Sequence, residues 1–131
     1  MASGMNEMRA IATDGAPRPV SAYSQGIDAG ALVAVSGQLG LDPATGEVPD
    51  DVREETRLVM EAIAAILGEA GLDMAAVAKT TIFLTDFADY QAVNEVYAGY
   101  FETPPARSTV KVAGLLKGAR VEIEALSVRR A

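Results

Sequence analysis

The chain of 131 residues contains no cysteine and no histidine. Without cysteine it has no disulfide, no thiolate nucleophile and no cysteine-based zinc site. Without histidine it lacks the commonest general base, the serine–histidine triad and most transition-metal sites. Carboxylates, tyrosine, lysine, arginine, hydroxyls and backbone groups remain. The sequence therefore suits a reaction that depends on positioning and modest electrostatics, and neither a metal nor a cofactor is expected.

Tryptophan is also absent and aromatic residues make up only 5% of the chain, so aliphatic side chains and methionine must fill the core. Half of the residues are hydrophobic, which predicts a folded protein, here a single domain over residues 9–131. Residues 1–8 hold three methionines and small polar residues, and they are expected to be a flexible leader. No apolar run approaches the length of a membrane span and no secretory signal is visible, so a soluble cytoplasmic protein without a membrane partner is expected.

Positive charge is scarce, because 11 lysines and arginines face 18 acidic residues and the net charge is −7. Nucleic-acid binding draws most of its affinity from lysine and arginine on phosphates. No basic stripe or alternation of basic and aromatic residues is present either. The composition therefore argues against a nucleic-acid partner.

The order of elements predicts an α+β domain in which two helices cover one face of a sheet. One helix is expected from about residue 51 to residue 70, and a second begins at Thr85 and Asp86 and ends at Pro104 and Pro105. Strands are expected near residues 9–12, 27–29, 32–35, 77–84, 108–112 and 121–129, with 32–35 buried on both faces and ending at Ser36 and Gly37.

Two strand-like runs near the carboxyl end, residues 105–110 (PARSTV) and 121–125 (VEIEA), carry charges where strands usually place neutral residues. Successive side chains of a strand point to opposite faces. If the apolar faces of both runs look into the core, Arg107 and Glu122 share the other face of one sheet. A guanidinium presents parallel N–H donors that match the two oxygens of a carboxylate, and a glutamate could hold a water molecule. The pair therefore predicts a site for a small anion. From the residues alone, a structural ion pair of Arg107 with Glu122 or Glu124 is equally open.

The sheet face that bears these charges would also carry apolar residues, among them part of 32–35, Phe83 or Ile82, and Leu126. Such a face is too apolar to leave in water. The sequence therefore predicts that copies of the chain bury it against one another, with polar pockets at the seams.

The same two runs carry a resemblance to a known family. Residues 105–108 (PARS) and 121–125 (VEIEA) resemble the two C-terminal signatures of the RidA/YjgF family, small proteins that hydrolyse reactive enamines and imines. Members were earlier labelled L-PSP endoribonucleases or translation inhibitors. Further segments resemble the family in the right order, namely residues 22–26 (AYSQG), 35–38 (VSGQ), 42–47 (DPATGE) and 93–97 (VNEVY).

The resemblance implies a chorismate mutase-like fold with a single mixed sheet, assembled as a homotrimer with sheets facing inward and active sites between neighbours. It implies a hydrolytic deaminase that converts intermediates of the 2-aminoacrylate or 2-iminopropanoate type to a 2-oxoacid and ammonia. Such a substrate is already an electrophile, which fits the modest chemistry that the composition allows.

In the residues of this sequence, the resemblance gives Arg107 the role of binding the substrate carboxylate and Glu122 that of orienting the attacking water. Tyr23 would line the pocket and is expected to be a third catalytic residue. The ordinary alternatives are a solvated strand residue for Glu122 and a packed aromatic for Tyr23.

Substrate-binding roles are implied for Ser36, Gly37, Thr109 and Asn94. Gly37 would let the backbone approach a ligand closely, although a turn explains Ser36 and Gly37 as well. Asn94 lies on an otherwise apolar helix face, where a satisfied buried amide is the more frequent role.

The sequence departs from the family pattern at three places. Thr109 replaces a common cysteine, which rules out a thiol mechanism and is mild if this position acts through its backbone. Ser21 and Ala22 replace a common Gly-Pro before the tyrosine motif, and residues 101–105 are shorter and lack the usual aromatic. Substrate size and preference therefore stay open.

Two other functions compete with the deaminase. One is a non-catalytic regulator or chaperone-like protein that binds small carboxylates on the same fold. The other is an endoribonuclease or translation inhibitor, which the net charge and the missing histidine disfavour.

Overall fold

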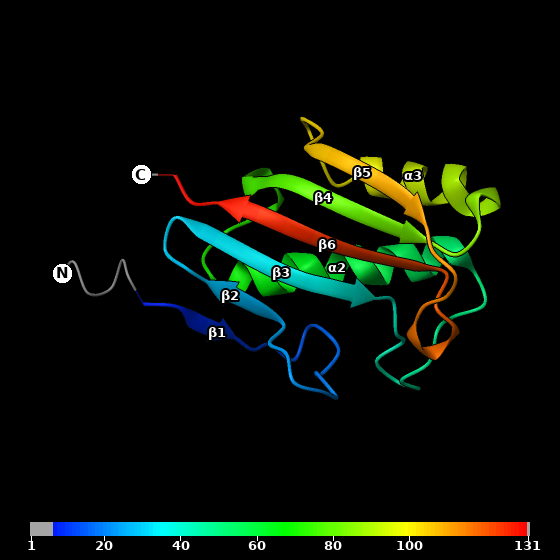
Figure 1. Ribbon diagram of the computed structural model, residues 1–131, viewed down its shortest axis with the longest axis horizontal. Coiled ribbons are helices and arrows are strands. Elements are labelled where there is room, and N and C mark those ends of the chain that lie inside the picture. Colours follow the sequence, from blue (N-terminus) through cyan, green and yellow to red (C-terminus); the bar gives the residue numbers. More distant parts are fainter. Residues whose placement is uncertain (1–6, 131) are drawn as a thin grey trace.

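The computed structural model describes residues 7–130. Figure 1 shows one twisted sheet with both helices packed behind the same face. The strand order is β1-β2-β3-β6-β4-β5, and β4 and β5 are parallel while the other pairs are antiparallel. The predicted mixed sheet with two helices on one face is thus confirmed. The elements are β1 (Arg9–Ile11), β2 (Gly26–Asp28), β3 (Leu32–Leu39), α2 (Val52–Glu69), β4 (Val77–Leu84), α3 (Tyr90–Ala98), β5 (Ala106–Lys111) and β6 (Val121–Val128), with short 3-10 turns η1 (Met74–Ala76), η2 (Phe87–Asp89) and η3 (Leu116–Gly118).

The leader predicted for residues 1–8 falls mostly outside the described residues, and the described part, Glu7 and Met8, is exposed. Over residues 7–130, no helix combines the length and the apolar character that a membrane span requires.

Helix α2 supplies one side of the core and has the predicted bounds within a residue. Asp51 caps its start by accepting a hydrogen bond from the backbone N–H of Arg53 at 2.8 Å. At its end Gly71 takes a positive φ of 75°, and the N–H of Leu72 returns to the carbonyl of Leu67 at 2.9 Å, a Schellman-type stop. Its buried face consists of Glu55, Thr56, Val59, Met60, Ala62, Ile63, Ile66 and Leu67.

The second helix is shorter than the sequence predicted. The carboxylate of Asp86 accepts a hydrogen bond from the N–H of Ala88 at 2.8 Å, which closes the 3-10 turn η2 in place of a first α-helical turn. Helix α3 begins only at Tyr90 and ends at Ala98, well before the prolines. The predicted bounds were therefore wrong at both ends.

Strand β3 also differs from its prediction. It continues through Ser36 and Gly37 to Leu39, with a bulge between Val35 and Gln38 in its pairing with β6. In the single chain it is buried on one face only, because Leu32 and Ala34 alternate outward and nothing in residues 7–130 covers them. The prediction of burial on both faces was wrong for the single chain.

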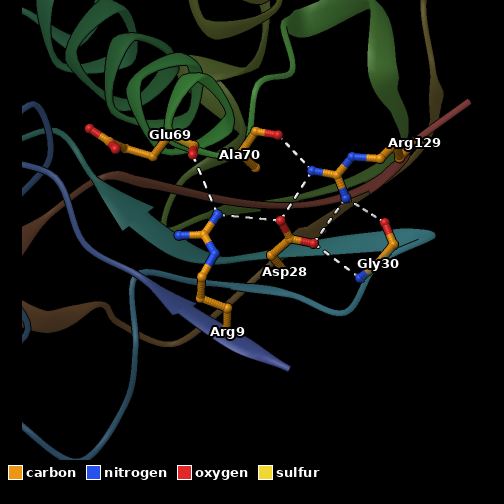
Figure 2. A network of polar contacts seen from close by, with 6 residues as sticks. All are labelled: Arg9, Asp28, Gly30, Glu69, Ala70 and Arg129. Atoms are coloured by element: carbon orange, nitrogen blue, oxygen red, sulfur yellow. Dashed lines mark hydrogen bonds and ion pairs between the residues drawn. The ribbon is translucent and has the colours of Figure 1, made fainter. Parts of the chain in front are cut away.

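An ionic cluster joins the edge of the sheet to the end of α2 (Figure 2). The Asp28 carboxylate accepts hydrogen bonds from Arg129 Nη1 and Nη2, at 2.9 and 3.1 Å, and from Arg9 Nη2 at 3.4 Å. Arg129 also donates to the carbonyl of Gly30 and, at 2.6 Å, to the carbonyl of Ala70, where the carboxyl end of a helix favours a cation. The hydrogen bonds from Arg129, followed by one from the Gly30 N–H, lower the pKa of Asp28 to about 2.

Replacing Asp28 with asparagine is expected to destabilise the fold by about 1 to 2 kcal/mol at neutral pH, because the cluster is partly screened by solvent. The folded-state pKa lies below the ordinary 3.8, so this stabilisation is present above pH 3.8 and disappears as the pH falls through about 2. Urea unfolding at equal protein concentration should therefore separate the variant from the parent at pH 7 and bring them together near pH 2. The control is Asp89→Asn, since Asp89 makes no side-chain cap hydrogen bond; an equal loss there would contradict the role of the cluster.

Candidate functional site

Arg107 is held on the helix-facing side of the edge strand β5 by two neutral side chains of α3. Its Nη1 donates to Asn94 Oδ1 and its Nη2 donates to the Tyr90 hydroxyl oxygen, both at 2.8 Å. No carboxylate of residues 7–130 forms an ion pair with it. The structure therefore excludes the ion pair with Glu122 or Glu124 within one chain and leaves a half-buried, fixed positive charge without a counter-ion among the described residues.

Aromatic rings support the guanidinium of Arg107. Its Cζ atom lies 5.1 Å from the centre of the Tyr97 ring and 5.7 Å from that of Tyr90, distances at which a ring face attracts a cation. Tyr97 is buried and shares a hydrogen bond of 2.6 Å with the hydroxyl of Thr80. Burial raises the pKa of Tyr97, so its ring carries no charge that would neutralise Arg107.

A small void lies beside Arg107 between β5, β4 and α3. Thr109, Asn94 and Tyr90 also line it, and it has no room for a water molecule. The Thr109 hydroxyl is buried there and has no hydrogen-bond partner in the described chain. A buried hydroxyl without a partner is unfavourable. Arg107, Asn94 and Thr109 are thus neighbours, and their roles in substrate binding stay a prediction.

Glu122 lies apart from Arg107, on the open face of the sheet, which is the face that no helix covers. Burial, and secondly the negative charge of Glu124, raise the pKa of Glu122 above its ordinary value. A Cβ atom at Gly37 would overlap its Oε2 atom, so the glycine on β3 makes room for the carboxylate. Over residues 7–130, no group of three carboxylates could hold a metal ion.

Arg107 and Glu122 do not share a face, and the prediction that they do was wrong. Val110 was expected to face the core with the rest of the apolar side. However, β5 is an edge strand whose Arg107 side faces α3, and Val110 is exposed. On β6 the apolar Ile123 faces the helices and Glu122 points away. The strand register places the two charged residues two strands apart and three residues out of step, roughly 14 Å across the sheet.

Tyr23 and Ser36 lie nearer to Glu122 than to Arg107. Tyr23 precedes β2, four strand positions from β5, and its side chain is 49% exposed. The Ser36 hydroxyl donates to the backbone carbonyl of Ser24 at 2.6 Å, and this hydrogen bond links the loop that carries Tyr23 to β3. Within one chain the predicted site residues therefore form two half-sites, one around Arg107 and one around Glu122.

Sequence reasoning missed two contributors to these half-sites. Tyr90 was not singled out, although its spacing of four residues from Asn94 puts both on the same side of α3. The fully buried Glu55 was not noticed at all. It accepts hydrogen bonds from Arg120 Nε at 2.7 Å and from the backbone N–H groups of Arg120 and Val121 at 2.8 and 3.3 Å, and so fixes the start of the strand that carries Glu122.

The fold and the half-sites define a class of protein: a small α+β domain with an arginine on its edge strand that no described carboxylate neutralises. The family model described as Endoribonuclease L-PSP matches residues 13–129. Over 92% of this chain and 95% of its own length, the protein DfrA of Myxococcus xanthus is 48% identical. The 2-iminobutanoate/2-iminopropanoate deaminase of Salmonella typhimurium is 44% identical over 93% of this chain and 98% of its own length.

Solved structures agree with these similarities. The crystal structure of E. coli TdcF with bound serine superimposes with a TM-score of 0.90 at 43% identity, and the match covers 93% of this chain and 99% of TdcF. The chain belongs to the RidA/YjgF family, which is also described as the endoribonuclease L-PSP family. Relatives at 43 to 44% identity in Salmonella typhimurium and E. coli are deaminase enzymes by name.

Proposed function

We propose that the protein is a hydrolytic deaminase of reactive 2-iminoacids and their enamine tautomers, of the 2-aminoacrylate and 2-iminopropanoate type. The observation that carries this proposal is the Arg107 guanidinium, which neutral partners fix in place while none of the described carboxylates neutralises it. A fixed guanidinium favours a carboxylate ligand that accepts two parallel hydrogen bonds. The serine bound to TdcF also bears a carboxylate, which supports the same ligand class here.

Glu122 is proposed to activate water in the hydrolysis. Its carboxylate takes a proton from water as the water oxygen bonds to the imine carbon, and then passes this proton to the imine nitrogen, which gives a carbinolamine and leaves Glu122 ionised. The hydroxyl proton of the carbinolamine then moves to the nitrogen through Glu122, the carbon–nitrogen bond breaks, ammonia leaves and the carbonyl of the 2-oxoacid forms. A raised pKa makes Glu122 a better base near neutral pH than an ordinary glutamate.

We also propose that the active site forms between subunits of a homotrimer. The half-sites of Arg107 and Glu122 lie on opposite faces of one sheet, so one chain alone cannot bring them together around a small molecule. The open face is apolar and exposed, which supports its burial against other copies. Its exposed large apolar side chains include Leu32, Val110, Leu126 and Val128.

The direct test supplies a 2-iminoacid, generated in place by an amino acid oxidase, and follows 2-oxoacid and ammonia release. Acceleration over buffer supports the deaminase, whereas binding of a small carboxylate without acceleration supports a regulator on the same fold. Sedimentation measures the assembly, and a stable monomer at micromolar concentration contradicts the shared site. A cytoplasmic location is part of the proposal and is checked by cell fractionation.

Ribonuclease activity, which the family description names, receives little support from this chain. Its net charge of −7 disfavours an RNA backbone. RNA cleavage that persists through extra purification steps and disappears in an Arg107 variant would reverse this conclusion.

Replacing Gly37 with alanine is expected to lower kcat about tenfold with a smaller change in KM. The added Cβ overlaps Glu122 Oε2, the far end of a flexible side chain, so the fold survives while the proposed base moves. Steady-state kinetics and thermal unfolding check this together. Gly68→Ala is the control, since a Cβ there meets no atom within 4 Å. Unchanged kcat in Gly37→Ala would mean that the position of Glu122 does not matter for turnover.

A further inference from the structure

The hydroxyl of Tyr90 stands beside the free N–H groups of Arg107 with its own hydrogen unused. Arginine can only donate hydrogen bonds, so the Tyr90 oxygen must accept the bond from Nη2 at 2.8 Å. The phenolic hydrogen therefore points elsewhere, and no described residue accepts it. Tyr90 is 41% exposed, which leaves the hydroxyl accessible from outside the chain.

The polar groups around the Arg107 guanidinium offer mainly donors. Asn94 uses its Oδ1 as an acceptor for Arg107 and keeps its amide N–H groups, and Arg107 keeps its remaining N–H groups. The Tyr90 hydroxyl adds a further O–H donor. A ligand that fits such a set presents acceptors only, as a carboxylate does.

We propose that Tyr90 is a substrate-contacting residue, whose hydroxyl donates a hydrogen bond to the carboxylate that Arg107 binds. This inference rests on the proposed function and extends it, because Tyr90 then helps to select carboxylates over neutral analogues. The guanidinium and the phenol ring lie in contact, so the two donors are held in one fixed arrangement. A prealigned donor avoids the entropic cost of ordering a side chain when the ligand binds.

Tyr90→Phe removes the hydroxyl and keeps the ring beside Arg107. Calorimetry with pyruvate as the probe is expected to show a Kd raised about tenfold, the effect of one hydrogen bond to a charged group. The KM for 2-iminobutanoate should rise similarly while kcat stays within about twofold. Binding of the neutral analogue pyruvamide should not change, and thermal unfolding should match the parent.

The matched control is Tyr100→Phe, which loses a hydroxyl that donates to Glu61 at 2.6 Å, away from Arg107. A Kd for pyruvate that is unchanged in Tyr90→Phe overturns the contact while the deaminase proposal stands. A fall in kcat without a change in KM also overturns it, because the hydroxyl would then act only by steadying Arg107. A parent protein that binds pyruvate but does not accelerate imine hydrolysis overturns the deaminase proposal, and the calorimetric comparison still decides the contact.

Discussion

Arg107→Lys is expected to lower kcat/KM for a 2-iminoacid at least 10- to 100-fold while secondary structure and assembly stay as in the parent. Lysine keeps the positive charge but loses the planar fork that presents two parallel N–H donors. It also cannot donate to Asn94 and Tyr90 in the observed geometry and still reach a ligand. Losing one hydrogen bond to a charged group costs roughly 1.5 to 3 kcal/mol, and misorientation of the substrate adds to this.

Kinetics with 2-iminobutanoate, sedimentation and circular dichroism check this prediction together. The matched control is Arg57→Lys, which makes the same change at an exposed arginine that pairs with Glu54 on α2. Near-normal turnover in the Arg107 variant would show that this arginine is structural and that the carboxylate is bound elsewhere.

Glu122→Gln is expected to reduce kcat about 100-fold while carboxylate binding changes little. Glutamine keeps the shape and hydrogen-bonding capacity of the side chain but cannot accept a proton from water, and general-base catalysis typically contributes 10²- to 10⁴-fold. In the parent, activity should rise with pH through the raised pKa of Glu122, because only the ionised carboxylate is a base. This acidic limb should disappear in the variant.

Glu124 provides a control on the same strand and face. Its negative charge is the second cause that raises the pKa of Glu122, so Glu124→Gln should keep turnover and move the acidic limb to lower pH.

Mixed assemblies provide a further control. If the half-sites meet between subunits, some sites in a mixture of Arg107→Lys and Glu122→Gln chains combine the intact Arg107 of one chain with the intact Glu122 of another. Part of the activity should therefore return. No recovery after exchange of subunits would contradict the shared site.

The sequence was sufficient for the elements with local signals. Helix α2 has a capping aspartate at Asp51 and a glycine stop at Gly71, and its bounds were predicted to within a residue. The late start of α3 at Tyr90 was missed because Asp86 caps a 3-10 turn. A 3-10 turn and a first α-helical turn have similar hydrogen-bond patterns, and the sequence does not determine which of them forms.

Alternation along each strand could not show whether Arg107 and Glu122 lie on the same face of the sheet. Alternation says which residues of a strand share a face, but which face looks at the helices depends on the neighbours. On the central strand β6 the apolar side is buried, as assumed. On the edge strand β5 the polar Asn94 and Tyr90 of α3 hold the arginine on the helix side, so the rule that the apolar side faces the core failed there.

The edge position of β5 also bears on how the protein behaves in concentrated solution. An edge strand presents unpaired backbone groups to which another chain can add, and proline or clustered charge usually prevents this. Here Ala106–Lys111 contains no proline, and its charges are Arg107 and Lys111. Copies that approach edge to edge bring these like charges together, and the net charge of −7 keeps molecules apart more generally. Colloidal stability should therefore be greatest at neutral pH and low salt, and acidification that neutralises the carboxylates removes the long-range part of that protection.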